Sequence, residues 1–319
     1  MADFPSDLLN RPAVDAAGLV ALRYLDDATA AAKRLSDPTD AEALHNFRVS
    51  LRRLRVTVRA FPGLHEGVAK KQRRRLRRLA RETNTIRDAE AQIAWFRDRS
   101  AQFTPAQRAA LGALRARLRS RRRRAQAHTH LELQQRFEKL ERKVRHAVTA
   151  LRSRAGAGEP PFRSIVAAAL VQSARDLRQR LEDRGATSPA ELHTTRIAAK
   201  RLRYLLEPVE SSVAQGTRLI DRLKQLQDLF GGLTDAHALQ GELQRATGND
   251  DQPGISAASN LLDSEVKDLL ETVRVDSSAA GVEIEKATMA VAQRLWPAPR
   301  RVRAPKPPRA TRRRARVPA

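Results

Sequence analysis

Residues 45–59 read His-Asn-Phe-Arg-Val-Ser-Leu-Arg-Arg-Leu-Arg-Val-Thr-Val-Arg, and they sort by chemistry with a period that only a helix has. At about 100° per residue, five basic side chains form a row within roughly 80° of the helix surface: His45, Arg48, Arg52, Arg55 and Arg59. A neighbouring arc of roughly 100° holds the apolar side chains Leu44, Phe47, Leu51, Leu54, Val58 and Phe61. No acidic residue stands inside the basic row to neutralise it through an i,i+4 ion pair. The stretch therefore predicts a helix with one face in a core and the next face turned toward an anion.

The composition also indicates an anionic partner. The chain has 319 residues, 41% of them hydrophobic, and a formal net charge of +25, so it can bury a substantial core and still be strongly basic. Nucleic acid, anionic lipid and polyphosphate all meet this charge requirement. The absence of cysteine excludes disulfides, thiolate chemistry and cysteine-based zinc sites. An aromatic content of 4% disfavours single-strand binding by base stacking.

The N-terminal residues lack the basic-then-apolar order of a signal peptide, and no apolar run approaches the roughly 18 residues of a membrane span. We therefore expect a cytoplasmic protein without a membrane span.

Helix signals without a sustained strand pattern predict an all-α fold with long helical hairpins. Thr39 with Glu42 is a capping-box signature before the basic helix, Thr104 precedes a long helical region with a break expected near residues 128–130, and Ser188 precedes another helix. A further break is expected at residues 277–278. We expect an N-terminal extension over 1–14, one domain over 15–296 with halves 15–154 and 162–296 joined by a linker at 155–161, and a disordered basic tail over 297–319.

The second half repeats the key features of the first. At an offset of 148 residues, the basic row aligns with a second one: His45, Arg48, Arg52 and Arg55 meet His193, Arg196, Lys200 and Arg203. At an offset of 147, Lys71, Arg75, Asn84 and Asp88 meet Arg218, Arg222, Gly231 and Asp235. Asn84 and Gly231 are the residue types best suited to a left-handed helix end. We interpret the repeat as an internal duplication that gives a pseudo-twofold molecule.

The pattern His-x-x-Arg-x-x-x-Arg/Lys-Arg-x-Arg, present at 45–55 and at 193–203, resembles that of the CHAD family, the conserved histidine α-helical domain. Residues 83–88 and 230–235 are similar to its Leu-Gly-x-x-Arg-Asp element, although Thr83-Asn84 replaces Leu-Gly and Thr234 replaces Arg. The resemblance implies two helical-bundle halves around a central basic channel that binds inorganic polyphosphate, and an association with polyphosphate granules. Family members are often fused to a CYTH triphosphatase domain, whose Glu-x-Glu-x-Lys mark is absent here. We therefore expect a stand-alone, non-enzymatic binding domain with no cofactor and no metal.

The candidate polyphosphate ligands are cations spaced by about one helical turn, roughly 5.4 Å, which suits a linear polyanion. They are His45, Arg48, Arg52, Arg55, Arg59, Lys71, Arg75, Arg78, His193, Arg196, Lys200, Arg203, Arg218 and Arg222. The two histidines either donate to phosphate or pack beneath the rows. Structural or orienting roles are expected for Asp88, Asp235, Asn84, Gly231 and Tyr204.

The sequence also fits an alternative function. The same charge, helped by the basic tail, suits a nucleoid- or RNA-associated architectural protein that binds nucleic-acid phosphates without sequence specificity.

Overall fold

The computed structural model describes residues 4–37, 40–156, 158–182, 188–246 and 253–296, and every regular element in these ranges is helical. The first half contains η1 (Leu8–Asn10), α1 (Ala13–Arg34), α2 (Ala41–Ala60), α3 (Pro62–Gly67), α4 (Lys70–Glu82), α5 (Asn84–Asp98), η2 (Ser100–Gln102), α6 (Pro105–Ala110) and α7 (Gly112–Arg152). The second half contains α8 (Phe162–Glu182), α9 (Pro189–Leu206), η3 (Glu207–Ser212), α10 (Gly216–Ala246) and α11 (Pro253–Leu295). The predicted all-α fold is confirmed.

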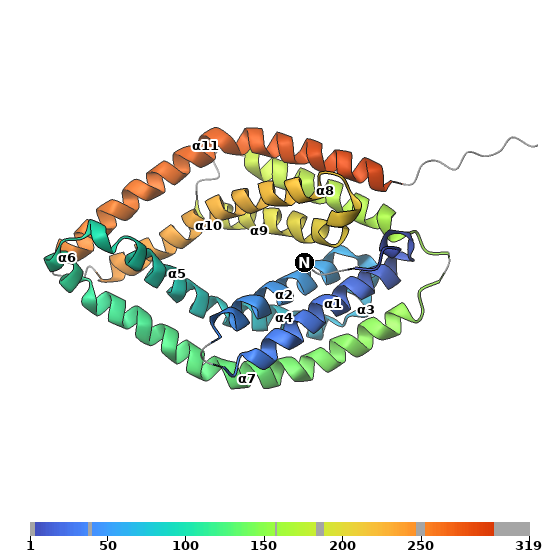
Figure 1. Cartoon of the computed structure of the whole chain (residues 1–319), viewed down its shortest axis with the longest axis horizontal. Coiled ribbons are helices and arrows are strands. Elements are labelled where there is room, and N and C mark those ends of the chain that lie inside the picture. The colour runs from blue at the N-terminus through green and yellow to red at the C-terminus, as the bar shows by residue number, and fades with distance from the viewer. Residues whose placement is uncertain (1–3, 38–39, 157, 183–187, 247–252, 297–319) are drawn as a thin grey trace, which may run out of the picture.

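The helices pair in the same order in both halves. In the first half, α1 packs on α2 and α7, and α5 packs on α7; in the second, α8 packs on α9 and α11, and α10 packs on α11. The halves contact one another through α6 with α11, α1 with α8, α2 with α9, and α5 with α10. Figure 1 shows α7 and α11 as the two long outer sides, with α2 and α9 between them. This arrangement is the one expected of a duplicated chain, and the duplication itself stays a prediction.

The predicted helix starts are confirmed at two capping boxes. The side chain of Thr104 accepts a hydrogen bond from the backbone N–H of Gln107 at 3.2 Å, and Ser188 accepts one from the backbone N–H of Glu191 at 3.3 Å. The basic helix begins differently, because its N-cap is Asp40. The carboxylate of Asp40 accepts hydrogen bonds from the backbone N–H groups of Glu42 and Ala43. The predicted cap at Thr39 lies outside the described residues, as does the tail 297–319.

Two expected helix breaks are wrong. The helix α7 runs through residues 128–130 and is instead separated from α6 at Leu111, and α11 runs unbroken through residues 277–278. Ser277 is 8% exposed, with Val273 and Ala280 buried on either side along the helix. The packing of these neighbours against the core outweighs the weak helix propensity of two serines.

The N-terminal extension is hydrogen-bonded to the linker. The backbone N–H of Ala13 donates to the carbonyl of Pro160 at 3.0 Å, and that of Phe162 donates to the carbonyl of Arg11 at 2.9 Å. The ring of Phe162 also lies 5.2 Å from that of Phe61, between centroids. These contacts tie the junction of the two halves to the start of the chain.

Candidate functional site

The predicted basic row forms along α2. Phe47, Leu51 and Leu54 are completely buried on one side of this helix. On the neighbouring side, His45 and Arg59 are exposed at the two ends of the row, and Arg48, Arg52 and Arg55 are half-buried between them. The fourteen steps from His45 to Arg59, at a rise of about 1.5 Å each, make the row roughly 21 Å long.

The second row lies along α9 and has the same distribution of exposure. Its first residue, His193, is exposed, while Arg196, Lys200 and Arg203 are half-buried. Leu192 is completely buried on the core side, as are Ala199 and Leu202. The half-burial of the basic groups follows from the packing of both helices against the shared core.

The two rows come together where α2 packs against α9. Burial, followed by repulsion from Arg52 and Arg196, lowers the pKa of Lys200 from 10.5 to about 6. Burial, followed by repulsion from Arg196, Lys200 and Arg52, also lowers the pKa of His193. Because Arg52 belongs to α2 and acts on both groups of α9, the site concentrates like charges from the two halves.

Several of these cations form no ion pair within the described part of the chain. Burial, followed by repulsion from Arg52, lowers the pKa of Arg48 to about 10; for Arg55, burial and then repulsion from Arg77 have the same effect. The buried Nε atoms of Arg48 and Arg196 have no hydrogen-bond partner there. Leaving such donors unpaired is costly, and an anionic ligand removes that cost.

A single arginine and two carboxylates lie beside the rows. The Nη2 atom of Arg87, from α5, donates to Oδ2 of Asp235, from α10, at 2.6 Å, and its Nη1 atom lies 4.0 Å from Oδ1 of Asp88. Burial raises the pKa of Asp88, with Arg87 opposing the shift and Asp235 adding to it. The position equivalent to Arg87 in the second half is Thr234, so one guanidinium serves both carboxylates.

The predicted left-handed helix ends at Asn84 and Gly231 are wrong. Asn84 is the first residue of α5, Gly231 lies inside α10, and the positive φ angle found among the described residues belongs to Gln215. Both positions instead contact the rows. The side-chain oxygen of Asn84 accepts from Nη2 of Arg48 at 3.3 Å, and a Cβ atom on Gly231 would lie 3.1 Å from Nη2 of Arg196. Gly231 therefore leaves room for an arginine.

The last cation of the α9 row, Arg203, belongs to an ion-pair cluster that joins the halves. Its Nε lies 3.3 Å from a carboxylate oxygen of Glu207, and its guanidinium lies 4.8 Å from the ring centroid of Tyr204, which is 1% exposed. Arg53 of α2 donates to the same Glu207 at 2.6 Å and lies over the ring of Tyr24. Arg203 is thus partly neutralised, unlike Arg196 and Lys200.

The sequence profile of the CHAD domain matches residues 20–244. The chain belongs to the CHAD domain family. The predicted resemblance is therefore confirmed, over a segment that includes both basic rows.

Two solved structures share the CHAD fold of this chain. The crystal structure of the CHAD domain from the plant Ricinus communis superposes with a TM-score of 0.61 at 21% identity, covering 88% of this chain and 96% of that one. PptA from Streptomyces chartreusis superposes with a TM-score of 0.62 at 18% identity, covering 85% of this chain and 99% of that one. No curated protein matches the sequence.

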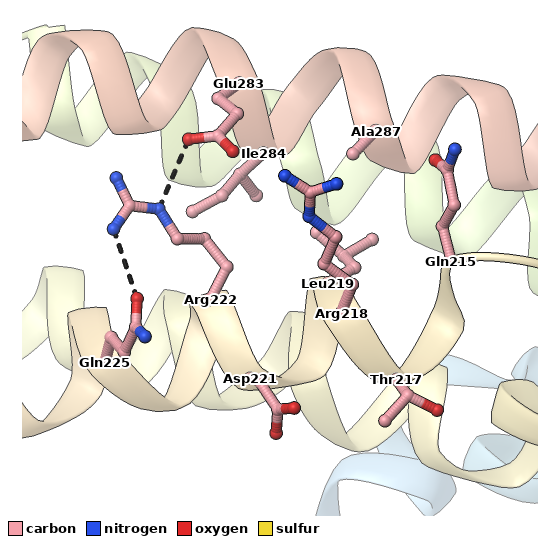
Figure 2. Close-up of a pocket in the computed structure, with 10 residues that line it drawn as sticks. All are labelled: Gln215, Thr217, Arg218, Leu219, Asp221, Arg222, Gln225, Glu283, Ile284 and Ala287. Atoms are coloured by element: carbon pink, nitrogen blue, oxygen red, sulfur yellow. Dashed lines mark hydrogen bonds and ion pairs between the residues drawn. The ribbon is translucent and has the colours of Figure 1, made fainter.

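Five of the predicted ligands lie apart from the two rows of this CHAD domain. On α4, Lys71, Arg75 and Arg78 are exposed, and Arg78 pairs with Glu82. On α10, Arg222 is nine residues before Gly231, which at about 100° per residue places it on the opposite side of the helix. Arg218 and Arg222 instead line a groove of about 740 Å³ between α10 and α11, where Arg222 Nε lies 3.2 Å from Oε2 of Glu283 (Figure 2).

Three further cations near the rows were not among the sequence candidates. Arg77 and Arg81 of α4 both lower the pKa of Arg55 by charge repulsion, after the larger effect of burial. Arg87 likewise acts on Arg48 and Lys200. Its place in the family element at residues 83–88 was a usable signal, whereas nothing in the sequence alone separates Arg77 from Arg78.

The described residues contain no group of three or more histidine, aspartate or glutamate side chains placed to hold a metal ion. In the same part of the chain, no helix combines the length and the apolar character that crossing a membrane requires.

Proposed function

We propose that this CHAD domain binds inorganic polyphosphate at the junction of α2 and α9, without catalysing a reaction on it. The observation that carries the proposal is the meeting of two basic rows, one from each half, with Arg52 beside Lys200 and Arg196. The CHAD family is associated with polyphosphate, which supports this choice of anion.

The geometry favours an extended polyanion over an isolated phosphate. The α2 row is roughly 21 Å long, and its cations recur at about one helical turn, so a chain with a charge on every unit can contact them in sequence. Arginine forks pair with phosphate oxygens in a bidentate manner, which fits the buried and unpaired Nε donors of Arg48 and Arg196.

Proton binding is part of the proposed mechanism. A polyphosphate chain beside Lys200 favours the charged form of its amine, which burial and Arg52 disfavour in the free protein. His193 responds in the same direction, because its pKa is lowered by burial and by neighbouring cations. The ligand thus adds negative charge beside Lys200, where no described carboxylate forms an ion pair with the amine.

The decisive experiment is a titration of the full-length protein with long-chain polyphosphate. The double variant Arg52→Gln with Lys200→Met should weaken binding by roughly two orders of magnitude, because each lost charge-assisted contact is worth about 1.5 kcal/mol or more. A matched control, Lys139→Gln with Arg142→Gln, removes two exposed cations from α7 and should change affinity by less than about threefold. Equal losses of polyphosphate affinity in the two double variants would contradict the proposal.

The alternative partner, nucleic acid, is tested by competition. Long-chain polyphosphate should displace duplex DNA from the full-length protein at physiological salt. Failure to displace it would favour the hypothesis of a nucleic-acid-binding protein.

Two further experiments test catalysis and localisation. Incubation with polyphosphate and Mg²⁺ should leave the length of the polyphosphate chain unchanged on a gel, and shortening would show that the site is catalytic. In a cell that stores polyphosphate, the labelled protein should be found at the granules.

A further inference from the structure

We call the proposed polyphosphate site at the junction of α2 and α9 the central site. One face of α4 carries cations that do not belong to it. Eight of the thirteen residues of this helix are lysine or arginine, and they divide between two flanks. Glu82 accepts from Arg136 of α7 at 2.6 Å, and Gln72 donates to a carbonyl of α7 at 3.4 Å, so one flank faces α7. The opposite flank lies toward the α2 row: α4 packs against α2, and Arg77 and Arg81 are near enough to Arg55 to repel its charge.

The cations on the flank toward α2 form a narrow stripe. At about 100° per residue they fall within roughly 60° of the helix surface, and at about 1.5 Å per residue they span roughly 16 Å. We call them the α4 stripe: Lys70, Arg74, Arg77 and Arg81. All four are exposed, and none of their side chains forms an ion pair or hydrogen bond with another described residue.

The same positions in the second half have the opposite charge character. At the offset of 147 residues, the α4 stripe aligns with Thr217, Asp221, Lys224 and Asp228 of α10. The single cation of this set, Lys224, lies 2.8 Å from Oδ1 of Asp221 and is neutralised by it. Thr217 and Asp221 point away from α11 in Figure 2, and Asp228 acts electrostatically on Arg196, so this set also lies toward its own basic row.

We propose that the α4 stripe extends the central site over the first half alone, so that a bound polyphosphate chain leaves the centre across α4 and not across α10. This inference rests on the proposed function. A chain running outward from Arg55 meets four unpaired cations, whereas one running outward from the α9 row meets two carboxylates. The domain therefore binds a linear polyanion with a fixed direction of exit, and its preference for long chains comes from α4.

The consequence is measurable as chain-length dependence. A short probe such as tripolyphosphate is held by the α2 and α9 rows and does not reach the α4 stripe. Long-chain polyphosphate contacts both, and each cation engaged also releases counterions and steepens the salt dependence of binding, as it does for nucleic-acid phosphates. The ratio of long-chain to short-chain affinity thus reports on the stripe separately from the centre.

The test compares two double variants of the full-length protein that lose the same charge. Arg77→Gln with Arg81→Gln removes half of the α4 stripe, and Lys71→Gln with Arg75→Gln removes two exposed cations from the other flank of α4. The first variant should lose roughly tenfold in long-chain affinity and should bind tripolyphosphate within about twofold of the original protein. The second should keep both affinities within about threefold.

Four outcomes would count against the inference or against the proposed function. Equal losses of long-chain affinity in the two variants, or an equal loss for both probes in the first variant, would overturn the inference and leave the central site standing. Binding of neither probe by the unaltered protein would instead overturn the proposed function. A complementary gain is expected from Asp221→Arg with Asp228→Arg, which should raise long-chain affinity by building a stripe on the second half; no gain would also count against the inference.

Discussion

Replacing Lys200 with methionine removes the amine whose protonation is most disfavoured at the junction of the two halves. The folded protein holds the pKa of this group at about 6, first through burial and then through repulsion from Arg52, Arg196 and Arg87. No anion pairs with Lys200 within the described residues. Methionine preserves the length and most of the volume of the side chain.

The sign of the effect follows from proton binding in the two states. An unfolded chain keeps the Lys200 proton up to a pH of about 10.5, whereas the folded protein keeps it only up to about 6. Between these values, unfolding takes up a proton, so stability rises with pH across the window. At about pH 7.5, which is three pH units below the pKa of the unfolded chain, the loss of this proton costs the folded state about 4 kcal/mol of free energy at 1.36 kcal/mol per unit.

The variant Lys200→Met should therefore be more stable than the original protein. We expect a gain of about 2 to 4 kcal/mol near neutral pH, seen as a rise of roughly 4 °C or more in Tm. Thermal unfolding in buffers free of phosphate and other polyanions measures it. The difference in the free energy of unfolding between the variant and the original protein should decrease by about 1.4 kcal/mol for each pH unit between pH 7 and pH 9.5.

The affinity for polyphosphate should fall in Lys200→Met, although its stability rises. Long-chain polyphosphate should bind Lys200→Met roughly tenfold more weakly, because one charge-assisted contact is lost. The original protein should take up a proton on binding at about pH 8, detected by calorimetry in two buffers of different ionisation enthalpy, and the variant should take up less. A variant that is less stable than the original at both ends of the pH range, or equal proton uptake in the two proteins, would refute this reasoning.

Three further predictions concern packing, two of them at the site and one where α11 meets α6. The substitution Gly231→Ala should leave Tm unchanged or raise it, because alanine favours a helix by up to about 1 kcal/mol, yet weaken polyphosphate binding about threefold by displacing Arg196, in a paired unfolding and binding assay. The substitution Gly254→Ala should destabilise the fold by about 2 kcal/mol in denaturant titrations, because its Cβ would lie 2.6 Å from a backbone oxygen of α6. A double-mutant cycle on Arg53 and Glu207, whose Nε and Oε2 atoms lie 2.6 Å apart, should give a coupling of about 1 to 2 kcal/mol.

A matched control and the contrary results make these predictions specific. At Gly112, the first residue of α7, no heavy atom lies within 4 Å of the position of a Cβ, so Gly112→Ala should be neutral or stabilising. Equal destabilisation by Gly112→Ala and Gly254→Ala would contradict the steric explanation. Unchanged polyphosphate affinity in Gly231→Ala would show that Arg196 does not depend on the glycine, and additive effects of Arg53 and Glu207 substitutions would show that the ion pair does not couple the halves.

The sequence was most informative where a helix has two clearly different faces. On α2 and α9, apolar residues such as Phe47 and Leu202 alternate with basic residues at helical spacing, so the buried side and the basic side could both be predicted. The family resemblance then added the fold, which the profile match confirms.

The sequence was less informative where local signals compete with packing. Gly231 and Ser277 resemble helix ends in the sequence, but they lie inside α10 and α11 because Arg196 fills the space above the first and buried neighbours flank the second. On α4 the cations nearly encircle the helix, so periodicity could not show which of them face Arg55. That choice depends on contacts with α7, which are remote in sequence.

The unpaired cations at the junction of α2 and α9 have a consequence for the lifetime of the protein in a cell. A domain whose folded form is penalised until an anion arrives spends more time partly open when that anion is scarce, and proteases act on open chains. If polyphosphate is the anion, its depletion shortens the half-life of the protein, and its accumulation protects it. The amount of this protein would then rise and fall with the cell's phosphate store without any change in the rate of its synthesis.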